Sequence, residues 1–250
     1  MLWAHRVRWL LLLLTYYLVL LTIRAVPYVG LFVVPMLRPV FAVGFLAAAW
    51  SQERGELPAI RHLFAGFRAN LRVLLLLGLF FVVGMTGAIA ATWLIDDGRL
   101  LEVMSGATVV DETFLASGSV QAAMLFGALC ALPVLLALWF APALVVFQDC
   151  DAPRALATSL RAAIANWRPI AMYALLLFLY LGVLPTFVAA IIAALVPEEA
   201  AYTVAVIVML PYLALLIATM HVSDYVSYRD IFHPDERLSA HDAPKGDAAP

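Results

Sequence analysis

The chain has 250 residues, of which 65% are apolar and only 13% charged, with a formal net charge of -2 and a mean hydropathy of +0.99. A water-soluble domain needs about 25% charged residues to cover its surface, so this composition excludes a soluble globular protein. The near-neutral charge argues against a nucleic-acid partner. The apolar runs lack the alternation of a β-barrel, so we predict an all-α, polytopic transmembrane helix bundle.

Six apolar runs are long enough to cross a bilayer, which takes about 20 helical residues. The expected spans are about 9–26, 28–50, 71–95, 119–147, 169–196 and 200–222. We expect the first run to be a span and not a removable signal peptide, because it ends at Arg24 and Pro27 without a small-residue cleavage site. Residues 1–222 therefore form one transmembrane domain. Residues 223–250 form a cytoplasmic tail that we expect to be disordered from about 234.

Charge is segregated between the two sides of the predicted bundle. Acidic side chains gather between residues 96 and 119 and at the turn that holds Glu198 and Glu199, whereas most arginines fall in the other connections. Under the positive-inside rule the arginine-rich side is cytoplasmic. We therefore expect a protein of the bacterial inner membrane with both termini in the cytoplasm.

Two cytoplasmic connections share a pattern, in which a proline (Pro58 or Pro153) precedes an apolar stripe and a row of arginines on another helical face. The apolar stripes are Ile60, Phe64, Phe67 and Leu71 in the first connection, and Leu156, Leu160, Ile164 and Trp167 in the second. The arginines are Arg61, Arg68, Arg72, Arg154, Arg161 and Arg168. We predict an amphipathic helix along the membrane surface in each connection. The arginines either bind anionic lipid headgroups or serve only to retain this side in the cytoplasm.

The joins into the following spans are also alike, with Asn70-Leu71-Arg72 in one case and Asn166-Trp167-Arg168 in the other. This similarity predicts three helical hairpins that form a degenerate internal repeat. The alternative is a chance similarity imposed by membrane composition. Glycines within the predicted spans, such as Gly78, Gly84 and Gly87, are predicted to be close-packing positions on helix faces.

Several longer motifs carry a resemblance to a known family. The run Trp139 to Val145 (WFAPALV) is followed by Asp149, Pro153, Ser159 and Asn166, and a later motif runs from Tyr225 to Phe232 (YVSYRDIF). With these motifs the chain resembles an uncharacterised family of β-proteobacterial inner-membrane proteins known by a locus-tag name, related to wider YciC-like families. The resemblance implies a helical inner-membrane protein of unknown activity, and it supplies no catalytic residues.

No pattern of residues predicts an active site. None of the five histidines lies in an H-E-x-x-H motif, and no G-x-S-x-G or phosphate-binding loop occurs, so we expect no catalytic, cofactor-binding or metal-binding residues. We expect a non-enzymatic structural or interaction protein, with a carrier or channel for a small or lipidic molecule as the alternative. The partners expected are membrane lipids, anionic ones included. Six prolines interrupt the spans and fit either function: Pro35, Pro39, Pro133, Pro142, Pro185 and Pro211.

Arg38 is predicted to lie about 11 residues into the second span, roughly 16 Å along the helix and thus near mid-membrane. No Asp or Glu lies within a predicted span, so the guanidinium group needs other oxygen atoms. Candidates are the carbonyls freed by Pro35 and Pro39, with the hydroxyls of Thr86 or Tyr17. Otherwise the side chain extends towards the headgroups, or it forms an anion or lipid-phosphate site within the bundle.

Overall fold

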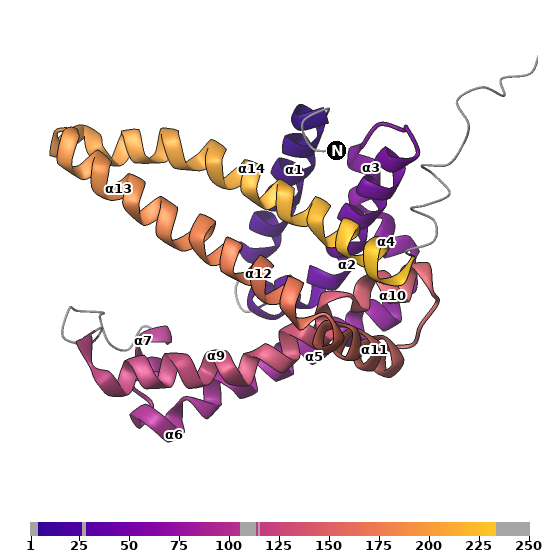
Figure 1. The fold of residues 1–250 in the computed structure, drawn as a ribbon, viewed down its shortest axis with the longest axis horizontal. Helices are drawn as coiled ribbons and strands as arrows, with labels where there is room; N and C mark the ends of the chain where they lie inside the picture. Colours follow the sequence, from indigo (N-terminus) through magenta and orange to yellow (C-terminus); the bar gives the residue numbers. More distant parts are fainter. Residues whose placement is uncertain (1–4, 27–28, 106–113, 115, 234–250) are drawn as a thin grey trace, which may run out of the picture. The chain divides into compact units, whose positions relative to one another are not determined.

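The computed structural model describes residues 5–26, 29–105, 114 and 116–233 (Figure 1). The tail from 234, expected to be disordered, lies outside these residues. The chain divides into two compact units. The first unit comprises Met1–Tyr17, Gly44–Leu63 and Ala165–Pro250, and the second unit comprises Leu18–Val43 and Phe64–Ile164.

Six helical stretches among the described residues are long and apolar enough to cross a membrane, which confirms the predicted all-α bundle of six spans. The sixth helix ends at Phe232 rather than at about 222, so the start of the predicted tail continues the helix. The elements that form the six stretches are α1 (Arg6–Arg24), α2 (Val29–Glu53), α5 (Leu71–Ala91) with α6 (Trp93–Asp96), α9 (Gly118–Trp139) with α10 (Ala141–Phe147), α12 (Trp167–Phe178) with η2 (Leu179–Val183) and α13 (Leu184–Leu195), and α14 (Glu198–Phe232).

Consecutive spans pair as hairpins within each unit. In the second unit α5 runs beside α9, and in the first unit α13 runs beside α14 (Figure 1). Near its start, α1 contacts the end of α2 in the first unit, where the Trp9 Nε1 donates a hydrogen bond of 2.9 Å to the Gln52 Oε1. Asn70 and Asn166 both stand at the N-cap position of the span that follows them, α5 and α12. The two joins share this position but not the capping bond, because the Asn70 side chain accepts a hydrogen bond from the Val73 N–H and the Asn166 side chain makes no capping bond to α12.

Small residues set the closest helix approaches in the second unit. A Cβ atom added to Gly78 would lie 2.7 Å from the Cα of Met36, so α5 and α2 touch backbone to backbone at this point. A Cβ atom on Gly84 would lie 2.8 Å from the side chain of Val134 on α9. The prediction for Gly87 was wrong, because no described atom outside its own helix lies within 4 Å of a Cβ built there.

A serine from α11 (Ala152–Ala165) closes the break between α9 and α10. Pro142 near the start of α10 interrupts the regular helix, and Phe140 takes the non-helical junction. In an uninterrupted helix the Phe140 N–H would donate to the Leu136 carbonyl. Here the Phe140 N–H donates to the Ser159 Oγ at 3.0 Å, and the Ser159 hydroxyl donates to the Leu136 carbonyl at 2.9 Å. The hydroxyl thus replaces the missing bond from both sides.

The surface segment after Pro58 differs from the prediction. It forms two short helices, α3 (Ile60–Leu63) and α4 (Ala65–Arg68), interrupted at Phe64, instead of one amphipathic helix. Gly66 favours this interruption, because glycine is a weak helix former and here it packs directly on the backbone of α2.

The second surface segment is one helix, α11, as predicted. Its buried face consists of small residues, namely Ala152, Ala155, Ser159 and Ala163. Within the predicted stripe, Leu156 and Leu160 are half-buried and Ile164 is 59% exposed. Trp167, which is 61% exposed, belongs to α12 and not to α11. The alanine face of α11 packs on the protein, and the stripe is exposed only towards the end of this helix.

Candidate functional site

A polar junction in the first unit connects the end of α2 to the end of α14. The Glu53 carboxylate accepts a hydrogen bond from the Tyr225 hydroxyl at one oxygen and forms an ion pair with the Arg229 guanidinium at the other. Tyr225 and Arg229 are four residues apart on α14 and so lie on the same helical face. Arg229 also pairs with Asp230, at 3.1 Å from Nη2 to Oδ1. Both oxygens of Glu53 are thus occupied, which suits a structural connection rather than a general base.

Close to this junction, an aromatic cluster surrounds His221. The imidazole ring stacks on the Phe45 ring with a centroid separation of 3.8 Å and an angle of 4° between the planes. The Tyr16 ring meets both at an edge, 5.3 Å from Phe45 and 6.5 Å from His221. The His221 Nδ1 lies 3.8 Å from the Asp224 Oδ2. One face of the imidazole is covered, so its ring is fixed in place by packing, and its edge contacts a carboxylate.

His62 forms a separate local site in the loop between α2 and α5. Burial lowers the pKa of His62 below its ordinary value of 6.5, the neighbouring Arg61 lowers it further, and Glu56 opposes this change. The Nδ1 atom of His62 accepts a hydrogen bond of 3.2 Å from the Ala59 N–H. Only the neutral imidazole can accept at this nitrogen, so the geometry and the lowered pKa agree.

The predicted arginines are all exposed, and among the described residues none of their guanidinium groups makes a hydrogen bond or an ion pair. They are distributed over both units. Arg61 and Arg168 lie in the first unit, and the others in the second. The seven residues are Arg38, Arg61, Arg68, Arg72, Arg154, Arg161 and Arg168.

Arg38 differs from its predicted surroundings. Its guanidinium group lies over the ring of Phe81, 4.9 Å from the centroid, and is exposed. The predicted hydrogen bonds to proline-freed carbonyls or to hydroxyl groups do not occur within the described part of the chain. An aromatic face supplies the negative potential that we had assigned to oxygen atoms.

The hairpin of α12, η2, α13 and α14, here called the C-terminal hairpin, contains a second proline break. In the π-helical segment η2 the Leu184 N–H donates to the Leu179 carbonyl, five residues back. The next residue, Pro185, has no N–H to offer to the Tyr180 carbonyl. The Tyr212 hydroxyl of α14 donates to that carbonyl instead, at 2.5 Å. The break is therefore closed by a bond that also joins the two halves of the hairpin.

A row of small residues runs along the open side of α13. Thr186, Ala190 and Ala194 are exposed, and Gly182 is half-buried, at a spacing of four residues that places them on one face. A Cβ atom on Gly182 would meet only Phe178, one turn away on the same stretch, at 3.9 Å. This row is called the α13 stripe below.

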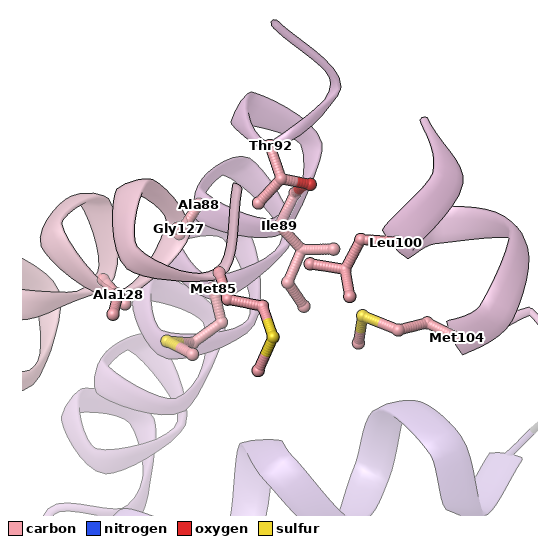
Figure 2. A pocket seen from close by; sticks show the side chains of 10 residues that line it. Met85, Ala88, Ile89, Thr92, Leu100, Met104, Gly127 and Ala128 are labelled. Carbon is pink, nitrogen blue, oxygen red and sulfur yellow. The ribbon is translucent and has the colours of Figure 1, made fainter. Parts of the chain in front are cut away.

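The second unit contains an apolar pocket of about 300 Å³. Its walls come from α5, α9 and the short helix α7 (Arg99–Met104), with Thr92 between α5 and α6. Figure 2 shows Leu100 and Met104 reaching from α7 towards Ile89. Sequence analysis missed this pocket because its methionines, Met85, Met104 and Met124, are far apart in the chain and match no motif.

The described residues contain no group of three or more His, Cys, Asp or Glu side chains placed to hold a metal ion. The polar junction was also missed, although Tyr225 and Arg229 belong to the YVSYRDIF motif. The spacing of four between them was the available signal. The partner, Glu53, could not be predicted, since it is 172 residues away from Tyr225.

Comparison with known proteins gives one clear relative. A protein of Burkholderia thailandensis described as a probable inner membrane protein is 33% identical over 231 residues, which cover 89% of this chain and 83% of that protein. No protein-family model matches the chain, and no solved structure matches it. The description of the relative states a membrane location and no activity.

Proposed function

We propose that this chain, which belongs to the family of the Burkholderia inner membrane protein and is a multi-pass inner-membrane protein, binds another membrane-spanning helix. The binding surface is the C-terminal hairpin, and the proposed role involves no enzymatic activity. The exposure of the hairpin carries this proposal. In each of the two spans Trp167–Leu195 and Glu198–Phe232, only 6% of the residues in the most apolar stretch are buried. The corresponding share in Phe32–Glu53 is 50%.

The α13 stripe supplies the docking geometry for a partner helix. In a bilayer the hydrophobic effect does not drive helix association, so contact depends on close van der Waals packing between small residues. The Thr186 hydroxyl is already satisfied by the Gly182 carbonyl at 2.8 Å, which lets this face pack without an unpaired donor.

Site-specific crosslinking tests this proposal in the full chain. A photoreactive residue at Ala190 should crosslink to protein in native membranes, and Thr186→Leu should abolish the crosslink because the added methyl groups hold the partner backbone away. Ala189→Leu is the matched control, since it adds the same kind of bulk about 100° around the helix from the crosslinking position Ala190 and about 60° from Thr186. Crosslinks to lipid alone, or crosslinks to protein that survive Thr186→Leu, would refute the proposal.

The orientation of the chain is a further part of the proposal. Arginines in the connections after α2 and α10 support a cytoplasmic location for these connections and for both termini. Reporter fusions after Trp50, after Gln148 and in the tail should report the cytoplasm, and fusions near Thr108 and Glu198 the periplasm. A periplasmic reading from the tail would refute the six-span orientation.

The exposed arginines of α11 support a role in binding anionic headgroups. Arg154 and Arg161 lie on the exposed side of α11, where each can contribute on the order of 1 kcal/mol of attraction to an anionic surface. Replacing both by Gln should weaken retention of phosphatidylglycerol in the purified protein without changing the topology. If the purified variant retains as much phosphatidylglycerol, the two arginines serve only to keep this side of the protein in the cytoplasm.

A carrier or channel is the second candidate, and the geometry favours it less. Proline breaks in transporters leave backbone groups that face a cavity. Here Ser159 closes the α9–α10 junction two residues before Pro142, and Tyr212 donates to the carbonyl that Pro185 leaves free. Solute flux in liposomes containing the purified protein would revive this candidate.

The wider relation to YciC-like families is proposed on the WFAPALV run and on the plan of three hairpins. In this chain the run occupies the buried helix α10 and the junction that Ser159 closes. The structure of a YciC-like protein should contain the same break and the same serine contact. A straight fourth span there would contradict the relation.

A further inference from the structure

The pocket between α5, α7 and α9 lies at the end of α5 opposite to the arginine-bearing Asn70-Leu71-Arg72 join. Its lining on α5 runs from Met85 to Ile89, and Thr92 follows. This depth corresponds to about 10 Å of helix. A volume of about 300 Å³ is at the lower limit of small-molecule sites, and it is large enough for part of a hydrocarbon chain.

The lining offers an occupant no polar contact. Of the ten lining residues, Thr92 has a side-chain hydroxyl group, and this hydroxyl already donates a hydrogen bond of 2.7 Å to the Ile89 carbonyl. The three methionines have flexible, polarisable side chains that adapt to an occupant of irregular shape. An apolar and flexible occupant therefore suits these walls better than a rigid polar solute.

One end of the pocket carries the features of a membrane interface. Trp93 follows Thr92 and is 58% exposed, as is typical of a tryptophan at headgroup level. Arg99 is exposed, precedes the lining residue Leu100, and makes no ion pair with a described residue. Its near neighbour Asp96 is buried and accepts hydrogen bonds from the N–H groups of Gly98 and Leu100, at 3.1 and 2.8 Å.

These observations combine an apolar pocket with an exposed cation on the residue next to the lining residue Leu100. The Asp96 carboxylate accepts hydrogen bonds from backbone N–H groups at the start of α7. The guanidinium group of Arg99 is therefore available to bind an external anion. A phosphate ester with an attached hydrocarbon chain matches both parts. A free inorganic anion would leave the pocket unfilled, and a simple hydrocarbon would leave Arg99 unused.

We propose that the pocket holds an acyl chain of a membrane phospholipid whose phosphate group contacts Arg99. The site lies wholly within the second unit and does not depend on the docking role of the C-terminal hairpin. The lipid is a bound structural ligand of α5, α7 and α9, and it remains with the protein when surrounding lipids exchange.

The test uses the full chain in vesicles that contain phosphatidylglycerol with a photoreactive diazirine in one acyl chain. Peptide mapping should locate the label on Met104 and Met124, well above its density on the exposed residues of α12. Ala128→Phe should lower this labelling about tenfold, because the ring displaces roughly two methylene groups from the pocket. Ala122→Phe, an exposed position on α9 outside the lining, should leave it unchanged.

Two further arms complete the test. If Ala128→Phe does not fold, Ala128→Leu fills the same space with less bulk and should lower the labelling in the same direction. Diacylglycerol with the same diazirine chain should label less than phosphatidylglycerol, and Arg99→Gln should remove this difference. Labelling that is equally dense on α12, or that is unchanged by both Ala128 variants, shows ordinary surrounding lipid and overturns the site. A preference for phosphatidylglycerol that survives Arg99→Gln overturns the phosphate contact.

Discussion

The stretch α9–α10 of the second unit and the stretch α12–α13 of the first have almost the same mean hydropathy, 2.4 and 2.5 in their most apolar windows. Yet 44% of the first window is buried and only 6% of the second. Hydropathy therefore decides that both enter the membrane, but it does not decide which one packs against protein. Placement of small residues and polar contacts makes that second decision.

Each stretch also contains a proline break, and the two breaks are closed in different ways. In α9–α10 a buried hydroxyl, Ser159, enters the helix ladder from a neighbouring helix. In α12–α13 an exposed hydroxyl, Tyr212, reaches the carbonyl that Pro185 leaves free. The first closure is surrounded by protein, and the second faces the membrane. The predictions below test whether this difference in surroundings is a difference in stability.

The largest effect is expected for Gly78→Ala in the closely packed second unit. The added methyl group would collide with the backbone of Met36, which cannot move like a side chain, so the free energy of unfolding should fall by about 3 kcal/mol. Gly87→Ala on the same helix is the matched control. Its Cβ meets open space, so it should raise stability by up to about 1 kcal/mol through helix propensity. Denaturant unfolding in mixed micelles measures both, and equal effects would contradict the close approach of α5 to α2.

A smaller effect, about 1 kcal/mol of destabilisation, is expected for Ser159→Ala. The variant leaves the Phe140 N–H and the Leu136 carbonyl buried without the hydroxyl that joins them. Thr158→Ala, one residue earlier and not part of the closure, should change the midpoint of thermal unfolding much less. A Ser159→Ala protein as stable as this control would show that the α9–α10 break needs no closure.

The sequence was sufficient for the number of spans and for their approximate limits, because lipid requires long apolar helices regardless of tertiary contacts. It was not sufficient for the helix interruption at Phe64, which depends on the contact between Gly66 and the backbone of α2. Gly78 and Gly87 illustrate the same limit. They have the same residue type and the same helix, but only Gly78 faces another backbone.

The candidate sites were less predictable than the fold. The exposed arginines followed from charge periodicity alone, and all of them are at the surface. The pocket and the polar junction bring together residues distant in the chain, so no local pattern indicates them. For Arg38 the sequence analysis considered only oxygen atoms as partners of the guanidinium group. The structure places the Phe81 ring beside this group instead, and an aromatic face also attracts a cation.

For the C-terminal hairpin, Tyr212→Phe should destabilise the protein by only about 0.6 kcal/mol, the usual size of a hydrogen bond between helices in a membrane protein. The Tyr180 carbonyl loses its donor from α14 but stays at an exposed position, where the cost is modest. Tyr202→Phe, at a residue that is 80% exposed and makes no hydrogen bond to the described residues, is the control. A loss larger than that of Ser159→Ala would reverse the proposed order of the two closures.

The smallest effect concerns pH and belongs to His62, in the connection between α2 and α5 and outside the two regions compared. Because burial and Arg61 lower its pKa in the folded protein below the ordinary value of 6.5, the unfolded chain binds the proton more readily. The stabilising contribution of neutral His62 is therefore complete above pH 6.5 and is lost as the pH falls through the lowered folded pKa. Protonation also removes the acceptor for the Ala59 N–H, so the start of α3 should loosen over the same interval. Amide exchange at Ala59, followed between pH 7 and pH 5 with His62→Ala as the reference, measures this loss of protection after correction for intrinsic exchange rates. A folded protein that gains protection on acidification would require a raised pKa and would exclude the neutral acceptor geometry.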